Sequence, residues 1–317
     1  MTITLSRMDK AWLAYMANRQ AVYLLDASIY IFRSYFAMPD VWHNDQGYSL
    51  NAVHGYTLFL LKLLSELNPA RIGAAFDESL GQCFRNDIYP EYKSSRALPD
   101  DSLAFQLKAC KRITELLGIR SYAHKRYEAD DLIATLARSS RTSGRPVHIL
   151  SRDKDLAQLV KKPDDCVFDP VDSRRLDYDA IVEKFGVRPD QLIDYQTLLG
   201  DPVDDIPGVP GIGAKTAAKL LQHFDSLVVL LENLDELGNG EWRGGARLQQ
   251  SLCEHREQME VSRQLVQLLD QVPMAFSIAD LQWQNPSLDA VKNYLKKIGL
   301  EGRILRTVEN SDIWCPA

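Results

Sequence analysis

Short apolar runs alternate with amphipathic stretches through the first part of the chain. Near-continuous apolar runs are typical of parallel strands that are buried on both faces. They predict strands at residues 21–25, 71–76, 119–123 and 147–150, and a short strand pair at 166–168 and 174–176. Strands that alternate with helices indicate an α/β fold with a parallel sheet.

Apolar residues at helical spacing occupy most of the remaining chain. Helices are predicted at 29–36, 50–67, 101–117, 178–185, 189–199, 214–223, 226–234, 248–269 and 288–298. A peripheral helix is also expected within the first 20 residues. The pattern predicts four regions: an N-terminal extension over 1–20, an α/β core over 21–200, a helical region over 201–275, and a C-terminal segment over 276–317 that packs on the core.

Three carboxylates stand within four residues at Glu128, Asp130 and Asp131, and the apolar run 132–134 follows at once. This order predicts a helix that begins at the acids. A helix N-terminus tolerates negative charge, because its unpaired N–H groups carry partial positive charge. The stretch is therefore either a strongly capped helix or a group of mutually repelling acids that a bound cation keeps ionised.

Further acids follow the predicted strands or the helix 189–199. They are Asp26, Asp77, Asp153, Asp155, Asp201 and Asp204. Functional residues of parallel sheets gather outside the carboxyl ends of the strands. We therefore expect one rim of the sheet to hold all nine carboxylates.

A glycine- and proline-rich stretch at 206–217 is the most specific part of the sequence. A phosphate-binding P-loop requires Gly-Lys-Ser/Thr in succession after a strand. Here Ala214 separates Gly213 from Lys215, which argues against a nucleotide site. A tight hairpin between two helices fits better, because N–H groups at the start of the helix 214–223 can bind a phosphate without reading sequence. A plain helix–helix turn is the alternative.

Residues 84–112 combine basic and aromatic side chains. The basic residues are Arg85, Lys93, Arg96, Lys108, Lys111 and Arg112, and the interleaved rings are Phe84, Tyr89, Tyr92 and Phe105. This pattern suits a nucleic-acid strand, since charges contact phosphates and rings stack on bases. A solvated helix face with buried aromatic residues is the alternative.

The net charge of −6 over 317 residues at first argues against a nucleic-acid partner. Setting the nine clustered acids aside leaves 34 of the 43 acids against 37 Lys and Arg, so the remainder is mildly basic. The five cysteines are scattered, which favours reduced thiols. No apolar run reaches the roughly 20 residues of a membrane span, and no signal peptide is recognised. We expect a cytoplasmic monomer without membrane contact.

Carboxylates without paired His or Cys favour hard cations, Mg²⁺ or Mn²⁺. Two such ions about 4 Å apart can clamp a phosphodiester for in-line displacement. No Ser/His/Asp constellation and no nucleotide-cofactor fingerprint competes with this interpretation.

Several of these elements, in one order, resemble the structure-specific 5′-nucleases: the N-terminal domain of bacterial DNA polymerase I, phage 5′-exonucleases and flap endonucleases. The resemblance runs from about residue 22 to residue 303. The matching motifs are Leu25-Asp26, Phe76-Asp77, Phe84-Arg85, Tyr92-Lys93 with Arg96, Tyr127-Glu128-Ala129-Asp130-Asp131, Asp153-Lys154-Asp155-Leu156, Gly200-Asp201 with Asp204, and Gly208-Val209-Pro210-Gly211-Ile212-Gly213-Ala214-Lys215-Thr216-Ala217.

The resemblance implies a PIN-like α/β nuclease core with a parallel-rich central sheet, a helical arch at about 80–112 and a helix-hairpin-helix subdomain. It implies a divalent-metal-dependent 5′-3′ exonuclease and flap endonuclease of DNA repair and replication, from a bacterial or phage-like source and associated with the nucleoid. Its partner would be duplex DNA with a 5′ single strand or flap. A catalytically silent DNA-binding module and a PIN-type ribonuclease are the alternative functions.

Carried over residue by residue, the resemblance implies two Mg²⁺ or Mn²⁺ sites. One would be held by Asp26, Asp77, Glu128 and Asp130, and the other by Asp153, Asp155 and Asp201, with Asp130 as the bridge and with Asp131 and Asp204 as close ligands or acting through water. The catalytic residues would be Lys93 and Arg96, on the scissile phosphate, together with Asp130 and Asp153.

The resemblance also implies the DNA contacts. In the arch, Tyr92 would stack on a base, and Arg85, Lys93 and Arg96 would contact DNA. The hairpin would bind the duplex backbone through Gly208, Gly211, Gly213, Lys215 and Thr216. Its carbonyls would hold a K⁺ ion. Arg126 stands where the family commonly has glycine, and we expect it to pair with an acid beside Glu128.

Overall fold

The computed structural model describes residues 20–79, 81–239 and 242–314. The helix expected within residues 1–20 lies outside the described residues, apart from Gln20. A six-stranded sheet forms the centre, in the order β3-β2-β1-β4-β5-β6, and only β6 is antiparallel to its neighbour. Its strands are β1 (Val22–Asp26), β2 (Ile72–Asp77), β3 (Arg120–His124), β4 (Val147–Leu150), β5 (Cys166–Asp169) and β6 (Arg174–Leu176). The predicted α/β class and parallel-rich sheet are confirmed.

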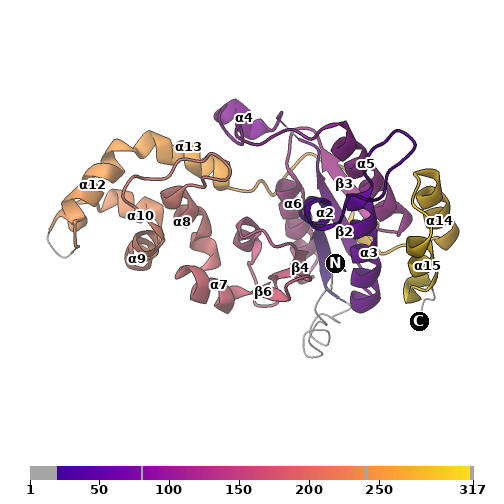
Figure 1. The fold of residues 1–317 in the computed structure, drawn as a ribbon. Coiled ribbons are helices and arrows are strands. Elements are labelled where there is room, and N and C mark those ends of the chain that lie inside the picture. Colours follow the sequence, from indigo (N-terminus) through magenta and orange to yellow (C-terminus); the bar gives the residue numbers. More distant parts are fainter. Residues whose placement is uncertain (1–19, 80, 240–241, 315–317) are drawn as a thin grey trace.

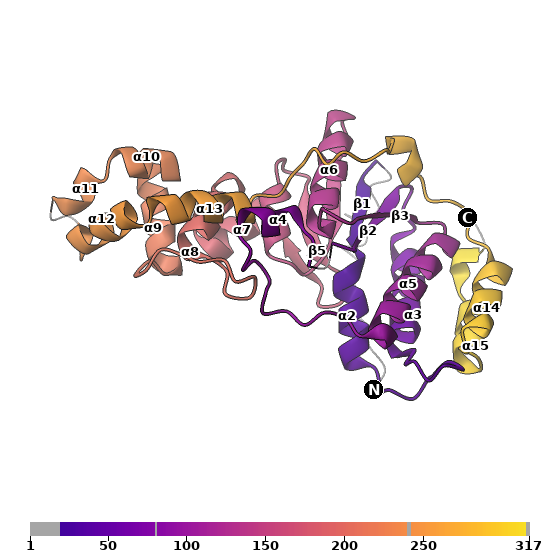
Figure 2. The same cartoon turned by 90° about the horizontal axis from the view of Figure 1, so that it is seen from above.

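Alternate residues of β1 enter two different cores, because successive side chains of a strand point to opposite faces. Tyr23 and Leu25 pack with one cluster, and Val22 and Leu24 with the other. The first face is covered by α2 (Ala27–Ala37), α3 (Asn51–Leu67) and α5 (Asp101–Leu116), and the second by α6 (Ala129–Thr142) (Figure 2). Burial on both faces explains the near-continuous apolar runs.

A helical half extends to one side of the sheet (Figure 1). It contains α7 (Tyr178–Phe185), α8 (Leu192–Leu199), α9 (Ala214–Phe224), α10 (Leu227–Glu232), α11 (Asp235–Gly238), α12 (Gly245–Glu254) and α13 (Arg256–Val266). The prediction of one helix over 248–269 is wrong. His255 has a non-helical backbone, with φ −109° and ψ 22°, and it separates α12 from α13.

The chain returns from α13 to the core across α6. The backbone N–H of Leu269 donates to Asp131, and that of Val272 donates to Thr135. The chain then ends in α14 (Leu288–Lys297) and α15 (Arg303–Glu309), which pack beside α3 and α5 (Figure 2). None of the described helices is long and apolar enough to cross a membrane.

The segment predicted as an arch is only partly helical. Helix α4 (Phe84–Ile88) is followed by turns and an extended stretch, and regular helix resumes at Asp101 with α5. The base of the arch packs against α13 through a small cluster that includes Cys83, Tyr92 and Leu265. The arch thus touches the helical half before it rejoins the core.

Candidate active site

Two neighbouring strands, β1 and β4, end where the strand order reverses. Ligands of α/β proteins bind at such a switch point. Asp26, the last residue of β1, accepts a 2.8 Å hydrogen bond from the Oγ of Ser151, which follows β4. The same Oγ accepts a 3.0 Å hydrogen bond from the backbone N–H of Asp153. One serine therefore joins two of the predicted acids at the switch point.

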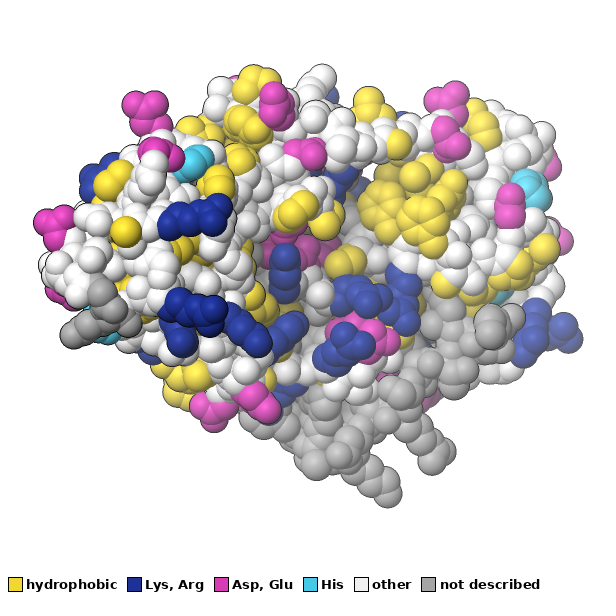
Figure 3. Space-filling model, turned by 60° about the vertical axis from the view of Figure 1, so that its left-hand side comes forward, with side chains coloured by type: hydrophobic (Ala, Val, Ile, Leu, Met, Phe, Trp, Pro, Cys, Tyr) yellow, Lys and Arg dark blue, Asp and Glu magenta, His cyan; other side chains and the backbone are white. Residues whose placement is uncertain are grey.

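A cavity of about 360 Å³ opens at this edge of the sheet, and acids dominate its lining. Eight of the nine predicted carboxylates lie in its wall: Asp26, Asp77, Glu128, Asp130, Asp153, Asp155, Asp201 and Asp204. Three basic side chains, Lys93, Arg96 and Lys154, line it as well. Figure 3 shows acidic side chains in a recess of one face, with Lys and Arg side chains around it.

Two basic side chains of the arch contact acids of this cavity. The Nζ of Lys93 contacts Glu128 and lies 3.5 Å from a carboxylate oxygen of Asp204. Arg96 pairs with Asp204 as well. The backbone N–H of Lys93 donates to the carbonyl of Asp204 at 3.1 Å, which fixes the arch to the loop after α8. The two residues predicted to hold the scissile phosphate therefore bind carboxylates in this structure.

Lys154 lies 2.9 Å from Asp201, and the sequence interpretation missed this contact although Lys154 stands between two predicted ligands. The remaining acids of the cavity lack such partners. In the described part of the chain, no Lys or Arg nitrogen lies within 4.0 Å of the carboxylates of Asp26, Asp77, Asp130, Asp153 or Asp155. A cavity with this surplus of negative charge favours a cation.

Burial and mutual repulsion raise the pKa values of Asp26, Asp130 and Asp155. Burial, and then the charge of Asp153, raise the pKa of Asp155 to about 7. Burial also raises the pKa of Asp26 to about 7; the hydrogen bond from Ser151 opposes this rise, and the charge of Asp153 adds to it. Burial, followed by Asp153 and Asp26, raises the pKa of Asp130 as well. Each of these shifts reports a carboxylate that is costly to ionise without a neighbouring cation.

The acids share one cavity, but they do not form a preorganised metal cage. Among the described residues, no group of three or more His, Cys, Asp or Glu side chains is arranged to hold a metal ion. The carboxylates repel one another. In addition, Glu128, Asp204 and Asp201 form ion pairs with Lys93, Arg96 and Lys154, respectively. The donors are hard carboxylate oxygens, the type that Mg²⁺ and Mn²⁺ prefer.

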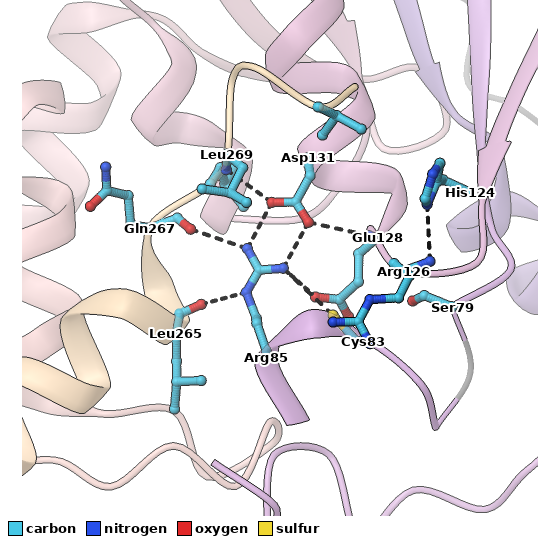
Figure 4. A network of polar contacts seen from close by, with 12 residues as sticks. Ser79, Cys83, Arg85, His124, Arg126, Glu128, Asp131, Leu265, Gln267 and Leu269 are labelled. Atoms are coloured by element: carbon cyan, nitrogen blue, oxygen red, sulfur yellow. Dashed lines mark hydrogen bonds and ion pairs between the residues drawn. The ribbon is translucent and has the colours of Figure 1, made fainter. Parts of the chain in front are cut away.

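Asp131 is the predicted ligand that the structure places elsewhere. Its side chain is fully buried and forms a two-pronged pair with Arg85, at 2.7 and 2.8 Å (Figure 4). It also accepts hydrogen bonds from the backbone N–H groups of Leu269 and Glu128. These contacts use both oxygens, and Asp131 is not among the residues that line the cavity, so the structure does not place it as a direct ligand there.

Two predicted DNA contacts are also buried. Arg85 is 1% exposed, and besides Asp131 it binds Glu128 and the carbonyls of Leu265 and Gln267 (Figure 4). Tyr92 is 4% exposed and donates its hydroxyl to Glu128 at 2.8 Å. Neither side chain can reach DNA in this arrangement. Both instead hold Glu128 in place.

Arg126 does not pair with the acids beside Glu128, contrary to the prediction. Its guanidinium binds Asp87 at the surface. Its backbone N–H donates to His124 Nδ1 at 3.0 Å (Figure 4), and Arg126 is not among the residues that line the cavity.

The glycine-rich stretch forms the predicted turn between α8 and α9. Gly208 packs so closely on Leu199 that a Cβ would lie 2.0 Å from its carbonyl oxygen. Gly211 has φ +86°, where a side chain would be strained, and Gly213 is the N-cap of α9. Lys215 and Thr216 follow in the first turn of α9, and Thr216 lines a groove together with basic side chains, Lys219, Arg243 and Arg247. The turn therefore presents backbone N–H groups beside positive charge.

Two family models together match most of the chain. The model described as "5′-3′ exonuclease, N-terminal resolvase-like domain" matches residues 21–186, and "5′-3′ exonuclease, C-terminal SAM fold" matches residues 187–289. DNA polymerase I of Bacillus subtilis is 33% identical over 299 residues, which are 93% of this chain and 33% of that protein. A 5′-3′ exonuclease of Aquifex aeolicus is 32% identical over 290 residues, covering 92% of this chain and 96% of that protein.

The chain thus spans about a third of the polymerase relative. Solved structures share its fold. The D15 protein of phage T5, crystallised with metal ions, has a TM-score of 0.64 at 19% identity, covering 88% of this chain and 98% of that one. The catalytic core of Rad2 in complex with DNA substrate has a TM-score of 0.63 at 17% identity, covering 95% and 94%.

Proposed function

This chain belongs to the 5′-3′ exonuclease family, and we propose on that basis that it is a divalent-metal-dependent 5′-nuclease acting on DNA 5′ ends and 5′ flaps. The observation that carries the proposal is the cavity at the switch point, where eight carboxylates face two basic residues of the arch. A protein that only bound DNA would have little reason to gather unpaired acids there, because their mutual repulsion destabilises the fold.

The carboxylate donors are of the type that hard cations prefer, although the metal-free structure does not preorganise them. We propose Asp26, Asp77, Glu128 and Asp130 for one ion and Asp153, Asp155 and Asp201 for the other, with Asp130 between them and Asp204 close by. When bound, such ions neutralise phosphate charge and activate water for attack on the phosphodiester. Asp131 is left out of the set, because its carboxylate does not line the cavity and is fully buried against Arg85 and two backbone N–H groups.

Lys93 and Arg96 are proposed to contact the scissile phosphate. Their present partners, Glu128 and Asp204, are both proposed to lie at or close to the ions. Cations at these acids would compete with the two basic side chains and release them toward a substrate phosphate. The same side chains thus offset part of the negative charge of the metal-free cavity, and they would bind the substrate phosphate once cations are bound.

The hairpin is proposed to bind the backbone of the duplex. Gly211 and Gly213 face open space at the positions where a Cβ would stand, so a phosphate can approach the N-terminus of α9. The carbonyls of the turn are candidates for a K⁺ site. The protein is proposed to act as a monomer on DNA that carries a 5′ single strand.

Incubation of the chain with a labelled 5′-flap duplex and Mg²⁺ is expected to release the flap and short 5′ products. Chelation of the metal should abolish this product, and replacement of K⁺ by another monovalent cation should weaken duplex binding. No cleavage with any divalent ion would leave a DNA-binding module as the function. Faster cleavage of a matched RNA flap would indicate a ribonuclease.

Stabilisation of the fold by Mg²⁺ should be larger at pH 8 than at pH 6. Asp26 and Asp155 have pKa values raised to about 7, so they stabilise the metal-free fold at low pH, and this stabilisation is lost as the pH rises through 7. Above pH 7 the ionised acids repel one another and bind a cation more strongly. At about 100 times its Kd the ion would add about 2.7 kcal/mol. Thermal melts at both pH values test this, and an equal rise in Tm at both would contradict it.

A further inference from the structure

A second, basic cavity opens at the same rim of the sheet, beyond the acid cavity. Its volume is about 550 Å³, and it is bordered by Ser151 and Arg152 after β4, by Arg174 and Arg175 of β6, and by Lys184 of α7. Ser151 also binds Asp26, and Arg152 directly precedes Asp153. The two cavities therefore share the end of β4 as a common wall.

Three guanidinium groups converge here on one carboxylate. Asp172, in the turn between β5 and β6, lies 3.5 Å from Arg33, 3.6 Å from Arg152 and 3.8 Å from Arg174. All three distances exceed a normal charge-assisted hydrogen bond. The single negative charge of Asp172 thus faces three guanidinium groups, and it forms only a long ion pair with each of them.

The other acids nearby do not offset this surplus of positive charge. Glu183 is an exposed acid of the same lining, but among the described residues it forms no ion pair with Arg152 or Arg174. Asp169 is 3% exposed and bonded to the hydroxyl of Tyr30 and to a backbone N–H. Asp177 pairs with Arg175 at 3.1 Å. The side chains of Arg152 and Arg174 are 39% and 76% exposed, so an incoming anion can reach them.

We propose that Arg152 and Arg174 bind a backbone phosphate of DNA on the β5–β6 side of the acid cavity. This inference rests on the proposed function and extends it, because Arg152 follows β4 and Arg174 begins β6, so neither belongs to the arch or the hairpin. Planar guanidinium groups bind phosphate oxygens through paired N–H donors, and such contacts position a strand without reading its sequence. DNA crossing the site would thus have a phosphate contact in addition to those proposed for the arch and the hairpin.

The test measures the affinity of the whole chain for a 5′-flap duplex in chelator, so that no cleavage occurs, over a range of salt concentrations. The double variant Arg152→Ala/Arg174→Ala is expected to bind about tenfold more weakly at moderate salt. The slope of log K against log salt should fall by about 1, because one phosphate is no longer neutralised. The variant Arg152→Lys/Arg174→Lys should keep most of the slope, because it keeps both charges.

Arg138→Ala is the matched control. Its side chain is 48% exposed and paired with one acid, and it lies in α6 well away from the helix start that faces the cavity. It should change neither affinity nor slope. Unchanged affinity and slope in the alanine pair, with a native thermal melt, would overturn the proposal.

Two further measurements distinguish a failure of the basic DNA site from a free-phosphate site and from a failure of the proposed nuclease function. Titration with inorganic phosphate at constant ionic strength should show no saturable binding; tight binding that the alanine pair abolishes would assign the cavity to a free phosphate instead. Cleavage of the flap by the parent chain in Mg²⁺ tests the proposed function by itself. A parent that cleaves, with an alanine pair that binds normally, would reject the basic site and leave the nuclease intact.

Discussion

Replacement of Arg85 by methionine is expected to destabilise the fold by about 3–5 kcal/mol, the range for breaking a buried ion pair by removing one partner. Arg85 is 1% exposed and lies between two buried carboxylates, those of Glu128 and Asp131. Methionine fills much of the volume, but it removes the positive charge between the two acids and the donors to the carbonyls of Leu265 and Gln267. Urea unfolding of the metal-free chain measures the loss.

Arg126→Met is the matched control, because Arg126 is an exposed arginine of the same region whose partner, Asp87, is also at the surface. It should leave the unfolding midpoint unchanged, since exposed pairs contribute little. The double variant Arg85→Met/Asp131→Leu should recover part of the loss, because it removes one of the unpaired charges along with the arginine. An Arg85→Met midpoint equal to that of Arg126→Met would show that the buried network is not needed for the fold.

This network joins three parts of the molecule. Arg85 belongs to the base of the arch, Glu128 and Asp131 stand at the start of α6, and Leu265 lies in α13 of the helical half. Because Glu128 also lines the acid cavity and binds Lys93, a displacement of α13 would move Arg85 and, through it, the cavity. The proposed binding of a duplex to the helical half would therefore act on the geometry of the acids through Arg85.

The sequence predicts the sheet and its rim well, because both depend on short-range patterns. Apolar runs such as residues 21–25 are continuous only because β1 is buried on both faces. Asp26 and Asp77 are the last residues of their strands, so parallel pairing alone brings them to one edge. An apolar run and the acid that ends it can both be recognised from a few neighbouring residues.

The roles of Asp131 and Arg85 could not be predicted in this way. Both match a nuclease motif, but their partners lie far along the chain: the carbonyl of Leu265 is 180 residues from Arg85, and the N–H of Leu269 is 138 residues from Asp131. Charge and spacing do not distinguish an acid that faces a cavity from one that faces a buried arginine. The helix break at His255 was missed for a related reason, since the apolar spacing continues across it.

Asp153→Asn is expected to lower the rate of flap cleavage by at least about a thousandfold, or about 4 kcal/mol of transition-state stabilisation. The amide keeps the shape of the side chain and an oxygen that can still accept the 2.9 Å hydrogen bond from the N–H of Asp155. It removes one negative charge from the proposed second ion site. Single-turnover cleavage of a labelled flap in Mg²⁺ measures the effect.

The same substitution should leave the metal-free fold at least as stable as the parent at pH 8. The charge of Asp153 raises the pKa of Asp26, Asp130 and Asp155, so its loss relieves repulsion among these acids. Affinity for flap DNA in chelator should also be retained, and Asp270→Asn, at an exposed acid paired with Arg138, should cleave normally. A variant that loses both binding and thermal stability would assign Asp153 to the fold, because a residue that acts only through bound cations leaves the metal-free protein intact.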